Sequence, residues 1–237
     1  MPRVVLVTGK GGVGKTTTAA ATAVRAARSG LRTLVMSTDA AHSLGDALDV
    51  DLRTARTWDD SHAVEPGLHA LAVGAHTAVE ADWQVVRDYL LGVLDAMGVD
   101  PVVADELTSL PGAEEVTALA ALPLQTQRGQ WDLVVVDCAP TAETLRLLAL
   151  PEVLGWHLDR LLPAQRRLLT VLRPAASAAT GVPVPGPEVL LVLRAWRDLM
   201  VEVRTLLTSP RASVRVVLTP ERVVIAESRR VLTSLSL

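Results

Sequence analysis

Short runs of consecutive apolar residues, separated by stretches that favour helices, form the basic pattern of this 237-residue chain. Val4–Val7 is such a run, and it is typical of a strand buried on both faces of a parallel sheet. The Ala-rich stretch Thr16–Ser29 favours a helix that ends at Gly30, and Arg32–Ser37 indicates a second strand. This strand–helix–strand order predicts a right-handed βαβ unit.

The same alternation continues with longer helical stretches. We expect Asp51–Pro66 to be polar and irregular, and Pro174–Pro187 to be a loop because its prolines remove backbone donors. Further strands are predicted at Leu68–Val73, Trp131–Asp137 and Ser213–Leu218. Further helices are predicted up to Leu48, over Thr77–Leu122 with breaks at Gly98, Pro101 and Pro111, and at Thr141–Leu150, Glu152–Leu172, Glu188–Leu207 and Glu221–Leu232.

These elements predict an α/β fold with a mostly parallel central sheet flanked by helices. The length suits one large domain, here residues 1–237. Two helical insertions, near 77–122 and 151–207, are expected to form a subdomain on one side of the sheet.

Composition and charge exclude several classes of function. The net charge of −3 provides no global field that would attract nucleic acid, and the aromatic content of 3% argues against base stacking on the protein. A single cysteine, Cys138, forms no disulfide or Cys-pair metal site within the chain, and next to an acid it is more often a small buried hydrophobe than a nucleophile. With no signal peptide and no membrane-length apolar run, we expect a soluble cytoplasmic protein.

Both lysines of the chain lie in one glycine-rich stretch, while every other basic side chain is arginine or histidine. Gly9–Thr16 matches the Walker A pattern of P-loop NTPases, and it follows a predicted strand and precedes a predicted helix. The loop amides form a nest for phosphate, Lys15 reaches the β- and γ-phosphates, and the Thr16 hydroxyl binds Mg²⁺. The expected nucleotide-binding residues of the loop are Gly9, Lys10, Gly11, Gly12, Val13, Gly14, Lys15, Thr16 and Thr17.

Lys10 is not part of the general motif and has two interpretations. One is a solvated loop lysine. The other is the additional lysine of the deviant Walker A group, which the stretch Lys10–Thr16 resembles. That resemblance implies that Lys10 reaches the nucleotide of a partner subunit and stabilises the transferring phosphate, which makes it catalytic and the protein a nucleotide-dependent homodimer.

Acids follow two of the predicted strands, where ligands of open α/β sheets bind. Asp137 is placed like a Walker B acid, which binds Mg²⁺ directly or through water. Asp39 is placed to orient or deprotonate the attacking water, although it is equally suited to capping the helix that follows. The five histidines are scattered, so we expect no metal site formed by them.

Longer stretches around these acids resemble the ArsA/Get family of arsenite-pump and tail-anchored-protein-targeting ATPases. Ser37–Leu44 is similar to the switch I signature of the family, with Ala40 in place of the usual proline. Asp137–Leu148 is similar to its switch II, from which it differs at Cys138, Ala142 and Glu143. Leu110–Glu115 and the turn Thr219–Glu221 resemble further family segments. The resemblance implies ATP and Mg²⁺ as cofactors, Asp39 as a catalytic residue, and Glu221 close to nucleotide at a dimer interface.

The resemblance also limits what is expected. The family continues with a strand bearing an adenine-contacting asparagine, whereas this chain contains no asparagine, so it is similar to a bacterial member that is incomplete after Leu237. The cysteine sets of arsenite-pump and eukaryotic targeting members are missing, so no metalloid site is expected. The Leu/Val-rich faces of Glu152–Leu172 and Glu188–Leu207 either pack on each other or form a groove for an apolar helical client.

The predicted function is Mg²⁺-dependent ATP hydrolysis coupled to opening and closing of a dimer, with a possible membrane-protein partner and no nucleic acid. Two alternatives remain open. A partitioning or positioning ATPase similar to ParA or MinD needs a basic face or an amphipathic C-terminal helix, and Val231–Leu237 is neither charged nor long enough for one. The other alternative is a nucleotide-binding regulator that does not hydrolyse ATP.

Overall fold

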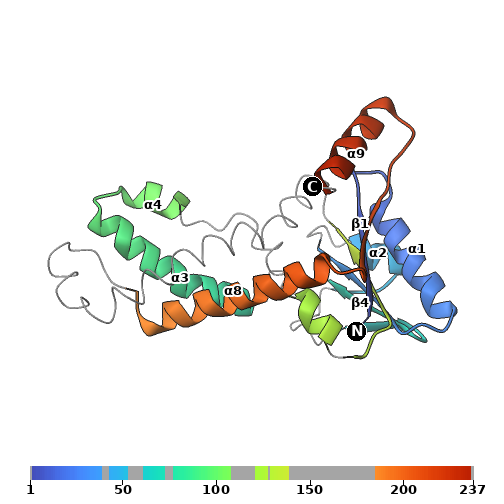
Figure 1. Cartoon of the computed structure of the whole chain (residues 1–237), viewed down its shortest axis with the longest axis horizontal. Coiled ribbons are helices and arrows are strands. Elements are labelled where there is room, and N and C mark those ends of the chain that lie inside the picture. The colour runs from blue at the N-terminus through green and yellow to red at the C-terminus, as the bar shows by residue number, and fades with distance from the viewer. Residues whose placement is uncertain are drawn as a thin grey trace. The chain divides into compact units, whose positions relative to one another are not determined.

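The computed structural model describes residues 2–38, 43–52, 61–72, 77–107, 121–127, 129–138 and 185–235 (Figure 1). Contacts within the chain divide it into two compact units. The first unit comprises Met1–His76, Glu114–Leu150 and Glu202–Leu237, and the second comprises Thr77–Ala113 and Pro151–Val201. Each unit is described by itself.

The first unit is built on a six-stranded sheet in the order β3-β4-β2-β5-β1-β6. Each pair of neighbouring strands is parallel except β3 and β4, which are antiparallel. The mostly parallel α/β fold predicted from the sequence is therefore confirmed. The strands are β1 (Arg3–Thr8), β2 (Thr33–Ser37), β3 (His62–Glu65), β4 (Leu68–Ala72), β5 (Leu133–Asp137) and β6 (Ala212–Val216).

The strand β3 corrects one prediction. Asp51–Pro66 was expected to be irregular, but His62–Glu65 pair antiparallel with β4 at the edge of the sheet. None of the four β3 residues is buried, so the strand lacks the apolar signal on which the prediction relied. An edge strand needs no buried face because the backbone ladder alone holds it in place.

Helix α1 (Lys15–Arg28) packs on the sheet through a row of alanines. Ala19, Ala20, Ala23 and Ala27 are buried against strand residues that include Val7, Val35 and Val135. Alternate strand residues point to the same face, so the side chains of Ser37 and Asp137 project toward this face, two positions beyond Val35 and Val135. The small alanine side chains let α1 pack close to the carboxyl ends of the central strands.

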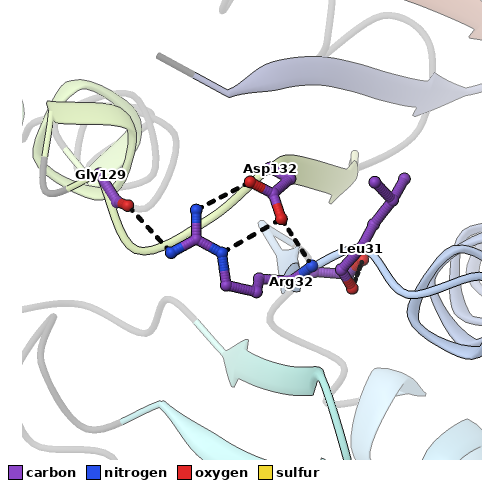
Figure 2. A network of polar contacts seen from close by, with 5 residues as sticks. Leu31, Arg32, Gly129 and Asp132 are labelled. Atoms are coloured by element: carbon purple, nitrogen blue, oxygen red, sulfur yellow. Dashed lines mark hydrogen bonds and ion pairs between the residues drawn. The ribbon is translucent and has the colours of Figure 1, made fainter.

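A polar network joins the amino ends of β2 and β5 (Figure 2). The guanidinium of Arg32 donates to both carboxylate oxygens of Asp132, at 3.1 and 2.8 Å, and to the carbonyl oxygen of Gly129 at 3.3 Å. The backbone N–H of Arg32 donates to the same carboxylate at 2.9 Å. These bonds lower the pKa of Asp132 to about 2. The network therefore lies at the amino ends of the strands, whereas the loop between β1 and α1 lies at their carboxyl ends.

Helices form the described part of the second unit. They are α3 (Thr77–Ala96), α4 (Pro101–Leu107) and α8 (Pro187–Leu207), of which residues up to Val201 belong to this unit. The indole rings of Trp83 and Trp196 stack with centroids 6.1 Å apart and planes 15° apart, which brings α3 and α8 side by side (Figure 1). The helices expected over 141–150 and 152–172 and the segment 174–184 lie outside the described residues.

Candidate functional site

The chain between β1 and α1 forms a glycine loop at the amino end of the helix. Gly14 is the N-cap of α1, with a φ of 91°, and Gly12 has a φ of 80°. Side chains strongly disfavour both conformations, so glycine is required for this path of the backbone. The first-turn amides of a helix have no partner within the helix and carry its positive dipole end. The loop therefore presents amide donors suited to an anion.

The entry of this loop is fixed by the strand β6. The backbone N–H of Val217, just after β6, donates to the carbonyl oxygen of Thr8 at 2.7 Å. Gly9 follows with a φ of 152°, and a Cβ at this position would overlap the carbonyl oxygen of Val217. Gly9 is thus needed for the close approach of two backbones.

Lys15 is the first residue of α1 and is buried, with 8% of its surface exposed. Its Nζ donates to the carbonyl oxygen of Lys10 at 3.3 Å, so the ammonium lies over the loop itself. Among the described residues no carboxylate forms an ion pair with Lys15. A buried ammonium without a nearby anion is costly, and an anion bound in the loop would compensate for that cost.

Thr16, the second residue of α1, is half-buried, and its hydroxyl contacts the next helix. The Thr16 Oγ1 lies 3.2 Å from the Oγ of Ser43, the first residue of α2 (Ser43–Leu48). The fully buried Leu44 anchors α2 in the core beside α1. Two hydroxyl groups from different helices therefore meet at the loop.

Asp137 ends β5, between β1 and β2, and is 1% exposed. The Ser37 hydroxyl, opposite it in the register of β2 and β5, donates to Asp137 Oδ2 at 3.5 Å. The backbone N–H of Thr38 donates to the Asp137 carbonyl oxygen at 3.0 Å. The Asp137 carboxylate and the Thr16 hydroxyl supply hard oxygen donors of the kind that Mg²⁺ prefers, so the donor chemistry fits the cation expected from the sequence.

The remaining predicted site residues differ in their placement. Glu221 is exposed just before α9 (Arg222–Leu235), where its Oε1 accepts a hydrogen bond from the Thr219 hydroxyl at 3.4 Å. It follows the carboxyl end of β6, which is parallel to β1. Asp39 lies outside the described residues. In the loop, Gly11, Gly12, Gly14 and Thr17 are exposed, Lys10 and Val13 are half-buried, and Gly9 is buried.

Ser37 and Ser43 are hydroxyl residues beside the site to which sequence reasoning assigned no role. Ser37 is 100 residues from Asp137, and Ser43 is 27 residues from Thr16. Only the strand order, with β2 beside β5, brings the first pair together. Ser43 lies within Ser37–Leu44, the stretch similar to switch I, and that resemblance is the signal that could have identified it.

Two features are absent from the described part of the chain. No three His, Cys, Asp or Glu side chains gather there as a metal site. No helix there is both long enough and apolar enough to cross a membrane. Cys138 is buried, and its backbone N–H donates to the Val7 carbonyl oxygen at 3.0 Å.

A glycine loop that joins the first strand of a mostly parallel sheet to a helix, with an acid at the end of the adjacent strand, defines the P-loop class of NTPase folds. Within this class, the chain belongs to the anion-transporting ATPase (ArsA) family, whose model matches residues 2–237. The family resemblance seen in the sequence is thereby confirmed.

Similarity to individual proteins also supports membership of the ArsA family. The chain is 36% identical over 99% of its length to a Chlorobaculum tepidum protein named as an arsenical pump-driving ATPase, covering 58% of that protein. It is 40% identical over 99% of its length to the Mycobacterium tuberculosis protein Rv2184c, covering 56% of it. It is 33% identical over 96% of its length to the Arabidopsis thaliana ATPase GET3B, covering 59% of it. The chain thus spans less than two thirds of the length of these relatives.

Proposed function

We propose that this chain is an ATP-hydrolysing domain that converts ATP and water to ADP and phosphate in the presence of Mg²⁺. The buried ammonium of Lys15, set in a glycine loop at the head of α1, carries the proposal. An ammonium in this position is suited to binding phosphate. No carboxylate among the described residues forms an ion pair with Lys15, a contact that would give the lysine a purely structural role. Membership of the ArsA family supports ATP as the nucleotide.

Each residue of the site has a role in this proposal. The amides of the loop and Lys15 bind the β- and γ-phosphates. Thr16 and Asp137 would hold Mg²⁺, which would neutralise charge on the phosphates and orient them. Ser37 donates to the Asp137 carboxylate and thereby fixes its orientation. Asp39 orients the attacking water and accepts its proton.

A partner subunit completes the site in our proposal. Lys10 reaches the nucleotide of the partner and stabilises charge on the transferring phosphate, and Glu221 contacts nucleotide at the interface. Binding and hydrolysis of ATP would then open and close a cytoplasmic homodimer. The coupled process in our proposal is the handling of an apolar helical client or a membrane-protein partner. The name of one relative, an arsenical pump-driving ATPase, supports the second of these.

A phosphate-release assay tests the hydrolytic step. The purified chain with ATP and Mg²⁺ should release phosphate in multiple turnovers, and EDTA should stop the release. Lys15→Ala should reduce the rate at least about a hundred-fold, because one charged contact to the transferring phosphate is lost. Tight ATP binding without phosphate release would instead identify a nucleotide-binding regulator and contradict the proposal.

A further inference from the structure

The hydroxyl group of Thr16 contacts the hydroxyl group of Ser43. Their oxygens are 3.2 Å apart, and either hydroxyl is able to donate. Ser43 is held firmly because the next residue, Leu44, is fully buried, and because a Cβ at Gly45 would lie 2.8 Å from the Val50 carbonyl oxygen. The contact therefore joins α1 and α2 at a fixed position.

When one hydroxyl of such a pair binds a cation, that hydroxyl becomes the hydrogen-bond donor of the pair. The oxygen gives a lone pair to the cation, and the cation repels the hydroxyl hydrogen, which then points away from it. That hydrogen needs an acceptor, and ligation makes it a stronger donor. The Ser43 Oγ, 3.2 Å away, is able to accept it.

We propose that Ser43 is a positioning residue for the metal ligand Thr16. By accepting the Thr16 hydrogen bond, Ser43 turns the lone pair of Thr16 toward Mg²⁺ and raises the affinity of the nucleotide-loaded site for the cation. Groups that orient a metal ligand in this way are worth roughly 10- to 100-fold in metal affinity. This inference rests on the proposed function, since it presupposes a Mg²⁺–nucleotide site at Thr16.

The experiment measures metal affinity directly rather than turnover. Mn²⁺ is titrated into the full chain with saturating ADP, and free Mn²⁺ is read by electron paramagnetic resonance. Ser43→Ala should weaken Mn²⁺ binding at least about ten-fold. Its affinity for a fluorescent ADP analogue in EDTA should stay within about two-fold of wild type, because Ser43 acts through the cation. Ser43→Thr keeps the hydroxyl and should restore Mn²⁺ affinity.

Ser29→Ala is the matched control. The Ser29 hydroxyl also bonds at an end of α1, donating to the Arg25 carbonyl oxygen at 2.8 Å, but at the end opposite the loop. This variant should bind Mn²⁺ as the wild type does. Equal Mn²⁺ affinity of wild type and Ser43→Ala would overturn the role of Ser43 alone. A wild-type protein that takes up no Mn²⁺ with ADP would overturn the proposed function and this role with it.

Ser43→Cys separates positioning from direct ligation. Ligands at right angles around Mg²⁺ are about 3 Å apart, so the observed spacing of the hydroxyls also suits a cation shared by both. A thiolate ligand prefers Cd²⁺. If Ser43 only positions Thr16, the Ser43→Cys variant should bind Cd²⁺ in the presence of ADP no more tightly than the wild type does. A clear gain in Cd²⁺ affinity would overturn positioning in favour of direct ligation.

Discussion

A side chain at Gly9 is incompatible with the position of Val217, because a Cβ there would overlap the Val217 carbonyl oxygen. The two backbones are held together by the hydrogen bond from the Val217 N–H to the neighbouring Thr8 carbonyl oxygen, at 2.7 Å. The loop therefore depends on β6, which follows it by some two hundred residues.

Gly9→Ala should destabilise the fold by at least about 2 kcal/mol, because either the loop or the end of β6 must move and the φ at this position disfavours a side chain. Urea denaturation followed by circular dichroism measures this loss. Gly11→Ala is the control within the same loop, since a Cβ at Gly11 meets nothing within 4 Å and should change the free energy of unfolding by less than about 0.5 kcal/mol. Equal stability of the two variants would contradict the argument.

Lys10 and Asp39 should be needed for turnover but not for folding. Lys10→Ala and Asp39→Asn are each expected to reduce phosphate release at least about a hundred-fold, since each removes a group from the proposed transition state. Thermal unfolding should stay close to wild type, because the Lys10 side chain is only half-buried. Wild-type turnover in both variants would refute the assigned roles.

The Arg32–Asp132 bridge should contribute to stability in a defined pH range. The pKa of Asp132 is lowered to about 2 by hydrogen bonds from Arg32, from an ordinary value of 3.8. A carboxylate whose pKa is lower in the folded than in the unfolded protein stabilises the fold fully at a pH above its unfolded-state pKa. This contribution is lost as the pH falls through its folded-state pKa. Asp132→Asn should therefore be less stable than wild type at pH 7, and the difference should vanish between about pH 4 and pH 2.

Thermal unfolding of both proteins across this pH range checks the prediction for Asp132. Asp46→Asn serves as the control, since it removes an exposed carboxylate on α2 that forms no ion pair with the described residues. A stability difference for Asp132→Asn that does not change with pH would contradict the assignment.

The Trp83–Trp196 stack should stabilise the packing of α3 on α8. Replacing Trp196 by Leu keeps the position apolar but removes the ring pair, and should cost about 0.5–1.5 kcal/mol beyond the change in buried area. A double-mutant cycle with Trp83→Leu isolates this pairwise energy. Near-ultraviolet circular dichroism should lose the same signal in either single variant. Additive effects of the two substitutions would show that the rings do not interact.

The sequence predicted β1, β2 and β5 well because each contains a continuous apolar run. Val134, Val135 and Val136 are all essentially inaccessible, as expected for a strand covered on both faces. The exposed β3 has no such signal and was missed. The loop could be predicted from its motif, because glycine spacing and the lysine reflect local geometry.

Contacts between distant segments could not be predicted in the same way. Ser37 meets Asp137 only because β5 is inserted between β1 and β2, and strand order is not encoded in the periodicity of any one strand. The dependence of Gly9 on Val217 has the same origin, since β6 lies beside β1. Sequence identified Gly9 as part of a motif, whereas the structure gives it a steric role.

The most direct test of the account compares two aspartates that flank β5. Mg²⁺ is titrated into a phosphate-release assay for wild type, Asp137→Asn and Asp132→Asn. Asp137 is the last residue of β5, at the carboxyl end of the strand beside the loop, and Asp132 directly precedes the strand at its amino end. The account predicts that Asp137→Asn loses Mg²⁺-dependent phosphate release at least about a hundred-fold while Asp132→Asn keeps it. Equal rates in the two variants, or no phosphate release by the wild type, would contradict it.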